Sequence, residues 1–238
     1  MSHVHAVVGP TGVGKTELAT ALAREMNAPI VVADRLQCYR ELATTSARSE
    51  GDKAAGIIRL HLDDRLVRDG DYPPAEASDA LVHQLEQLRA RHPYVVVEGG
   101  SISVLQHFVR RRKELSIDFS AHVLQISDEA EYRHRLFTRA RRMLMPELGL
   151  PGMLRELEDA WQNELNRDFV ASINGFEAIL AWSYKHSFSP ASLTSIELDE
   201  EMLDNLTWMV VDAHAEHGME QQQEFCRIFA RRPVYNSF

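Results

Sequence analysis

Short apolar runs rich in valine and isoleucine recur through the first half of the chain, each bounded by polar or turn-forming residues. Runs of this length and composition are typical of buried parallel strands. The four runs cover residues 3–8, 30–33, 94–97 and 122–126. Stretches with helical spacing separate them, at residues 14–26, 75–91 and 101–112. Strands that alternate with helices predict βαβ units, and therefore an α/β fold with a doubly wound parallel sheet.

The pattern changes after residue 128, where strand-like runs cease and only helical spacing continues. We predict helices at residues 128–145, 151–165, 168–187, 199–217 and 219–230. The expected breaks fall at residues that commonly interrupt helices, namely Pro146, Pro151, Pro190 and Gly218. Two parts are therefore predicted: an α/β core over residues 1–142 that ends in a basic, lid-like helix, and an acidic helical layer over residues 143–238.

Charge is distributed unevenly between these two parts. The chain has 26 Lys and Arg against 35 Asp and Glu, a formal net charge of −9. Residues 1–142 carry 20 basic and 19 acidic side chains, whereas residues 143–238 carry 6 and 16. An extended nucleic-acid surface usually shows a basic excess across the whole domain. We therefore expect small phosphorylated ligands, and no nucleic acid, as partners.

Composition excludes further classes of protein. No run approaches the roughly 18 consecutive apolar residues of a membrane helix, and the N-terminus lacks the basic flank and length of a signal peptide. The two cysteines, Cys38 and Cys226, are too few for a disulfide framework or a structural zinc site. We expect a cytoplasmic protein with no membrane partner.

A phosphate-binding motif follows the first predicted strand and opens the first predicted helix. Its pattern, G-x4-G-K-[ST], is formed by Gly9, Pro10, Thr11, Gly12, Val13, Gly14, Lys15 and Thr16. Such a P-loop directs backbone N–H groups and a helix N-terminus at an oxyanion. Lys15 adds a full positive charge, and Thr16 is a candidate ligand of Mg²⁺. The motif predicts a di- or triphosphate site but leaves open whether a phosphoryl group is transferred, hydrolysed or only recognised.

Acidic residues follow two of the predicted strands. Asp34 comes directly after the second strand, and Glu98 after the third. The carboxyl ends of parallel strands converge on the ligand crevice in a doubly wound sheet, so both acids should overlook the P-loop. Either could hold a metal ion or act in catalysis, and Glu98 could instead cap a helix or brace a loop.

Four blocks in this order resemble the bacterial adenylate dimethylallyltransferases, the isopentenyltransferases that begin cytokinin synthesis. The blocks are G-P-T-G-V-G-K-T from residue 9, A-D-R-L-Q-C-Y from residue 33, A-T-T-S-A-R from residue 43 and E-G-G-S-I-S-V-L from residue 98. The family transfers a dimethylallyl group from its diphosphate to N6 of AMP and releases pyrophosphate. The resemblance thus implies a P-loop that binds a leaving diphosphate without phosphoryl transfer.

The resemblance also implies roles for individual residues. Asp34 matches the general base, while Thr11, Lys15 and Arg139 match residues that neutralise the diphosphate with Mg²⁺ on Thr16. Nucleotide contacts are implied for Asp34, Ser46, Arg48, Ser101 and Asn174. His214 and His217 fall where relatives line the prenyl-donor pocket, and a polar residue there is associated with a hydroxylated donor.

Purely structural roles remain alternatives for several of these residues. Arg139 could belong to a solvated basic helix face, Ser46 and Arg48 to a plain polar loop, and the two histidines to a half-exposed helix. The sequence also departs from the family at Asn174 and Glu177, where the motif usually reads Ile-Asp-Gly-Tyr-Arg. An amide must donate where a carboxylate accepts two hydrogen bonds, so this change bears on nucleotide contacts and donor preference.

Three other functions compete with this interpretation. A tRNA dimethylallyltransferase shares the P-loop and the Asp-x-x-Gln turn, but typically has extra helical structure and a basic surface. A P-loop small-molecule kinase would use Lys15 and the lid arginines for γ-phosphate transfer to a hydroxyl. A nucleotide-binding regulator without turnover is a third alternative, disfavoured by the two strand-end acids.

Overall fold

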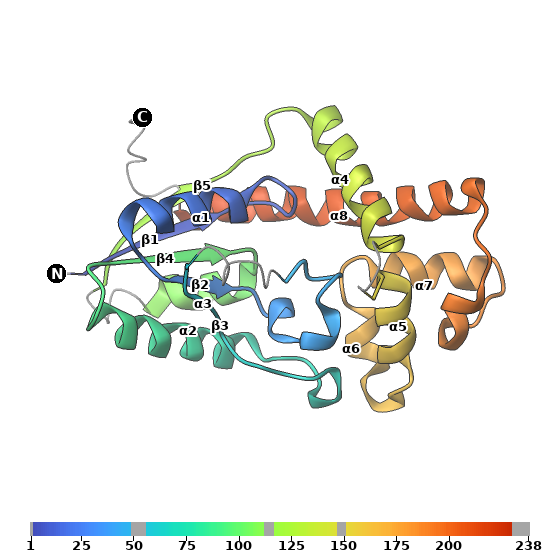
Figure 1. The fold of residues 1–238 in the computed structure, drawn as a ribbon, viewed down its shortest axis with the longest axis horizontal. Coiled ribbons are helices and arrows are strands. Elements are labelled where there is room, and N and C mark those ends of the chain that lie inside the picture. The colour runs from blue at the N-terminus through green and yellow to red at the C-terminus, as the bar shows by residue number, and fades with distance from the viewer. Residues whose placement is uncertain (1, 49–55, 112–116, 147–150, 230–238) are drawn as a thin grey trace.

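A parallel sheet forms the centre of the protein in the computed structural model, which describes residues 2–48, 56–111, 117–146 and 151–229 (Figure 1). Its five strands have the order β3-β2-β4-β1-β5, and every neighbouring pair is parallel. Their bounds are β1 (His3–Val8), β2 (Ile30–Ala33), β3 (Arg59–His61), β4 (Tyr94–Gly99) and β5 (Asp118–Val123). Because β1 is flanked by β4 and β5, the P-loop that follows it emerges in the middle of the sheet.

The sequence predicted the inner strands well and the edge strands poorly. β1 and β2 have the predicted bounds, and β4 extends two residues further, to Gly99. β3 was not predicted, because Arg59-Leu60-His61 is a short edge strand with polar ends. The prediction of a strand at residues 122–126 was wrong: β5 lies at Asp118–Val123. As an edge strand, β5 alternates polar and apolar residues. The apolar run on which the prediction was based, residues 122–126, continues beyond the end of β5.

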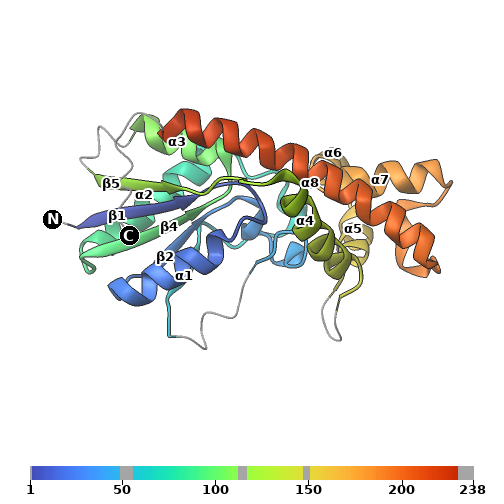
Figure 2. The same ribbon diagram turned by 90° about the horizontal axis from the view of Figure 1, so that it is seen from above.

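Helices cover both faces of the sheet (Figure 2). Their bounds are α1 (Lys15–Met26), α2 (Pro74–Arg89), α3 (Ile102–Arg111), α4 (Glu129–Leu144), α5 (Met153–Trp161), α6 (Arg167–Ala171), α7 (Phe176–Lys185) and α8 (Glu200–Phe229). On one face, α1 packs Ala19 and Ala23 against Val7 and Val32 of the sheet. The other face packs against α2, α3 and the end of α8. Side chains thus alternate between the faces, and the sheet is buried on both, which explains the Val-rich strands. The predicted α/β fold of P-loop type, with helices after the sheet, is confirmed.

The segment predicted as one helix at residues 168–187 is divided. Gly175 adopts φ 92, a left-handed conformation that favours glycine, and separates α6 from α7. The helix predicted at 151–165 also ends early, at Trp161, and a 3-10 turn over Glu164–Asn166 follows it. Asn174 therefore lies in a turn between two helices rather than within a helix.

The break predicted at Gly218 was wrong, because α8 continues through this residue (Figure 1). A Cβ atom built on Gly218 would clash with the Tyr132 hydroxyl of α4. Glycine is present here for close packing of α4 on α8, not to end a helix. One helix consequently runs from the helical layer back across the sheet, where Phe225 is buried.

We expect Gly218→Ala to lower the free energy of unfolding by about 1–3 kcal/mol, the typical cost of overpacking a core. In an exposed helix interior the same change would stabilise by about 1 kcal/mol, so the sign of the effect is diagnostic. Urea unfolding of the two proteins measures it. An increase in stability would show that Tyr132 does not occupy the Gly218 notch.

Ion pairs join the basic helix α4 to the acidic helix α8. Arg133 pairs with Asp212, and Arg141 pairs with both Glu200 and Asp204. These pairs lie at the surface, where each contributes little stability. They do, however, compensate much of the positive charge of α4. Some acidic residues of the C-terminal part of the chain are thus neutralised by arginines of α4, which belongs to the N-terminal part.

Candidate active site

Two adjoining cavities lie at the carboxyl ends of the strands. One, of about 360 Å³, is lined by the P-loop residues Thr11–Thr16 together with Glu98 and Arg135. The other, of about 440 Å³, extends from Gly100 and Ser101 to α6 and α8. Four residues line both cavities: Thr11, Asp34, Ser46 and Arg139. The shared residues mark a junction at which ligands in the two cavities would meet.

The P-loop has the conformation needed to surround an anion. Gly12 and Gly14 have φ values of 73 and 94, and α1 begins directly after Gly14. Lys15 Nζ donates a 2.5 Å hydrogen bond to the carbonyl oxygen of Pro10. Burial lowers the pKa of Lys15 to about 8, although Asp34 and Glu98 oppose the shift. The amine is therefore still mostly protonated near neutral pH and faces the cavity as a cation.

Glu98 orients the hydroxyl of Thr16. Thr16 Oγ1 donates a 2.6 Å hydrogen bond to Glu98 Oε1, and the other carboxylate oxygen pairs with Arg59 of β3. The side chains of Arg59 and Glu98 are each only 5% exposed. This arrangement matches the loop-bracing alternative for Glu98. Arg59 was missed in the sequence because β3 was missed.

The donor set around Thr16 fits a magnesium ion. Mg²⁺ in phosphate sites typically takes one or two protein oxygens and completes its shell with waters and phosphate oxygens. The Thr16 hydroxyl, with its hydrogen committed to Glu98, presents lone pairs as a ligand would. Glu17, Asp34 and Glu98 add carboxylates to the lining of the same cavity.

Asp34 lies at the end of β2 with one oxygen held and the other toward the junction. Its Oδ1 accepts a 2.9 Å hydrogen bond from the backbone N–H of Leu36. Its Oδ2 would lie 3.2 Å from a Cβ atom on Gly100, so a side chain at position 100 would crowd it. Burial raises the pKa of Asp34, opposed by the Leu36 N–H and Lys15. A poorly solvated carboxylate of this kind is a stronger base than a free one.

Arg139 reaches the junction from α4, opposite the arginines that pair with α8. It lines both cavities, and its Nε has no hydrogen-bond partner among the described residues. Burial lowers its pKa, whereas Tyr132, Glu17 and Asp34 act in the other direction. The solvated-face alternative does not fit this position. Arg135, which the sequence analysis did not single out, also lines the P-loop cavity.

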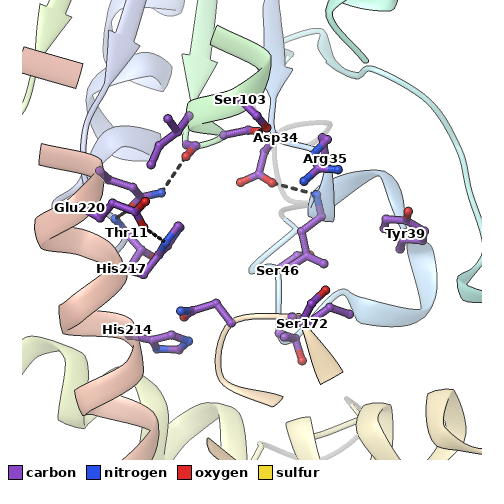
Figure 3. A pocket seen from close by; sticks show the side chains of 18 of the residues that line it. Thr11, Asp34, Arg35, Tyr39, Ser46, Ser103, Ser172, His214, His217 and Glu220 are labelled. Atoms are coloured by element: carbon purple, nitrogen blue, oxygen red, sulfur yellow. Dashed lines mark hydrogen bonds and ion pairs between the residues drawn. The ribbon is translucent and has the colours of Figure 1, made fainter. Parts of the chain in front are cut away.

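The predicted nucleotide and donor residues gather in the second cavity, with one exception. Ser46, Ser101, Asn174, His214 and His217 all line it, together with the aromatic and apolar side chains of Tyr39, Phe169 and Ile173. Figure 3 shows Ser46, Tyr39, His214 and His217 around this cavity. Arg48 is not among the lining residues. Its guanidinium donates to the carbonyl oxygens of Gln37 and Cys38, at 2.8 and 3.3 Å. In this structure Arg48 supports the loop beside the site rather than facing it.

The two histidines differ in environment. His214 is buried, and burial followed by the charge of Arg139 lowers its pKa to about 4, so the ring is neutral near neutral pH. Its Nδ1 has no hydrogen-bond partner in the described part of the chain. His217 is half-exposed and lies 3.4 Å from Glu220 (Figure 3). The half-exposed alternative therefore describes His217 but not His214.

Asn174 uses its amide nitrogen within the protein. Nδ2 donates a 3.2 Å hydrogen bond to the carbonyl oxygen of Ala213 on α8. The remaining polar atom, Oδ1, can only accept hydrogen bonds. An aspartate, which the family motif usually has at this position, could not donate this bond to Ala213. Asn174 therefore links the α6–α7 turn to α8 in a way that an aspartate could not.

A buried carboxylate missed in the sequence holds the segment before Ser46. Glu156 of α5 accepts hydrogen bonds from the backbone N–H groups of Thr44 and Thr45, at 2.7 and 2.8 Å, and from the Thr45 hydroxyl at 2.6 Å. Its one sign in the sequence is a charge within the apolar face of α5. The contact ties the helical layer to the site.

No helix in the described ranges is long and apolar enough to span a membrane. The fold and the two cavities define an α/β protein of the P-loop class with a phosphate site and an adjoining, partly apolar site.

Comparison with known proteins narrows this class. Residues 2–233 match the family model of isopentenyl transferases, so the chain belongs to the isopentenyl transferase family and is a prenyltransferase. Adenylate dimethylallyltransferase of Rhodococcoides fascians is 38% identical over 95% of this chain and 89% of its own length. Adenylate dimethylallyltransferase of Agrobacterium fabrum is 30% identical over 98% of this chain and 95% of its own.

Solved structures share the fold at much lower identity. The tRNA isopentenylpyrophosphate transferase of Bacillus halodurans superposes with a TM-score of 0.74 at 14% identity, over 94% of this chain and 87% of that one. The corresponding enzyme of Staphylococcus epidermidis gives a TM-score of 0.70 at 14% identity, over 94% of this chain and 90% of that one. These likenesses support the fold.

Proposed function

We propose that this protein transfers a dimethylallyl group, or its hydroxylated counterpart, from the diphosphate to N6 of AMP and releases pyrophosphate, as the first step of cytokinin biosynthesis. The observation that carries the proposal is the junction of the two cavities at Thr11, Asp34, Ser46 and Arg139. A phosphate cavity that opens onto a second, partly apolar cavity suits two substrates that must react with each other. The names of the relatives support an adenine nucleotide as the acceptor.

The P-loop cavity would hold the diphosphate of the prenyl donor. As the bond between C1 and the diphosphate oxygen breaks, its electron pair leaves with the diphosphate. The Lys15 ammonium, the Arg139 guanidinium and the P-loop N–H groups stabilise that charge. Thr16, with Glu98 as its hydrogen-bond acceptor, would hold a Mg²⁺ ion that would further neutralise the phosphate oxygens.

The second cavity would place the adenine amine beside C1. An exocyclic amine conjugated into adenine is a poor nucleophile, so loss of its proton must accompany attack. Asp34 lies at the junction with a raised pKa and accepts that proton as the bond between N6 and C1 forms. Holding the prenyl donor and the adenine nucleotide at one junction further accelerates prenyl transfer, because the two substrates react without having to meet in solution.

Features of this chain favour AMP over tRNA as the acceptor. The basic helix α4 has Arg133 and Arg141 paired with acids of α8, which leaves less positive charge for a polyanion. A kinase is disfavoured by the match to the isopentenyl transferase family and by relatives named as dimethylallyltransferases. Both alternatives are outcomes of the assay below.

Mass spectrometry of the products tests the proposal. The purified protein is incubated with Mg²⁺, dimethylallyl diphosphate and, in separate reactions, AMP, ADP, ATP or an unmodified tRNA. We expect the prenyl mass increment on AMP with release of one pyrophosphate per product. Prenylation of tRNA alone would establish the rival transferase, and consumption of ATP with no prenylated product would establish a kinase.

The polar donor pocket leads to a prediction about donor choice. We expect His217→Leu to lower kcat/KM for the hydroxylated donor about tenfold relative to dimethylallyl diphosphate, since one lost hydrogen bond corresponds to about 1–2 kcal/mol. His186→Leu, on an exposed position after α7, is the matched control. Equal losses with both donors would make His217 a structural residue.

A further inference from the structure

A side chain from the end of the sequence contacts the start of the P-loop. Gln221 of α8 is 4% exposed, and its Oε1 accepts a 2.7 Å hydrogen bond from the backbone N–H of Thr11. Its Nε2 donates a 2.7 Å hydrogen bond to the carbonyl oxygen of Gly100. One amide group thus connects the P-loop to the turn after β4, at the lining of the second cavity.

The carbonyl side of Thr11 is held as well. Tyr132 of α4 donates a 2.9 Å hydrogen bond from its hydroxyl to the Thr11 carbonyl oxygen. Burial raises the pKa of Tyr132 to about 12, so the hydroxyl stays protonated and remains a donor. Gly218 provides the notch for this hydroxyl and lies one helical turn before Gln221 on α8.

We propose that Gln221 and Tyr132 are positioning residues for prenyl transfer, which fix the Thr11 backbone from both sides and so aim the Thr11 hydroxyl at the cavity junction. This proposal rests on the proposed function. Thr11 lines both cavities, and among the described residues its hydroxyl makes no hydrogen bond within the protein. The hydroxyl is therefore available to the diphosphate while two hydrogen bonds hold the backbone beneath it.

The placement of these two residues supports a role in catalysis beyond packing. A P-loop normally directs its backbone N–H groups at the anion, yet here the first N–H after Pro10 is committed to a side chain. A buried amide that satisfies both of its polar ends holds a defined geometry. A displacement of the reacting groups by about 1 Å can cost about a hundredfold in rate.

A double-mutant cycle with matched controls tests this proposal. Gln221→Met keeps the volume and removes both hydrogen bonds, whereas Gln222→Met on the same helix removes a bond to the Ile126 N–H and no bond to Thr11. We expect Gln221→Met to lower kcat about tenfold or more, with each KM changed less than about threefold. In a Thr11→Ala background the same change should lower kcat less than about twofold, because the positioned hydroxyl is already absent.

Tyr132→Phe is the second variant and keeps the ring in place. It should also lower kcat in the parent and have little effect in the Thr11→Ala background, whether or not Gln221→Met folds. Losses that multiply with Thr11→Ala, or losses equal to that of Gln222→Met, would overturn the proposal. A parent protein that forms no prenylated product would overturn the proposed function, and this proposal with it. An active parent whose variants show either of the contrary results would overturn this proposal alone, so the two failures are distinguishable.

Discussion

Asp34→Asn is expected to lower kcat by about 10²- to 10⁴-fold, the range that a general base contributes. The amide has the same shape and can still accept the Leu36 N–H bond that fixes the side chain. It cannot take the proton from the adenine amine. Both substrates should bind with affinities within about threefold of the parent, because the change removes only the basic group.

The measurement is a steady-state assay combined with calorimetry of each substrate. Asp212→Asn on the surface of α8, paired with Arg133, is the control and should keep parental turnover. The raised pKa of Asp34 adds a second readout: parental kcat should fall as the pH drops through this pKa, since the base becomes protonated. Undiminished turnover by Asp34→Asn would remove Asp34 from the mechanism.

Lys15→Ala is expected to weaken binding of the donor diphosphate by about 10- to 100-fold, because a hydrogen bond to a charged group contributes about 1.5–3 kcal/mol. AMP binding should change less than about threefold, since Lys15 lines only the P-loop cavity. The exposed Lys185 at the end of α7 provides the control Lys185→Ala. Calorimetry that showed the larger loss for AMP would place the nucleotide on the P-loop.

The pH dependence of donor binding has a defined sign. The pKa of Lys15 is about 8, so the free amine becomes neutral as the pH rises through 8. Donor affinity of the parent should therefore fall above this pH, with proton uptake on binding. Lys15→Ala should lose this dependence, which distinguishes an effect of Lys15 from ionisation of the ligand.

Local signals in the sequence predicted the chemistry of the sheet core. The P-loop lies between β1 and α1 as expected, and the strand-end acids Asp34 and Glu98 both line its cavity. Glycine spacing and buried apolar runs are short-range features, so the local structure that they indicate depends little on the rest of the chain. The resemblance to a family added Arg139 and the histidines, which composition alone could not place.

Residues that act through distant contacts could not be predicted. Arg59 contacts Glu98 across 39 positions, Glu156 holds Thr45 across 111, and Gln221 holds Thr11 across 210. None of these belongs to a local motif. Gly218 was misread for the same reason: its notch is filled by Tyr132 from another helix. Long-range polar contacts depend on topology, which the hydrophobic pattern specifies only in outline.

The central claim is that the two cavities hold donor and acceptor at the same time, with the diphosphate on the P-loop. Equilibrium titration of AMP into protein saturated with Mg²⁺ and the unreactive S-thiolodiphosphate analogue of the donor tests it most directly. We predict that one AMP binds per chain with an affinity equal to or higher than that for the free protein. Displacement of the analogue by AMP would mean that both compete for the P-loop, and would contradict the account.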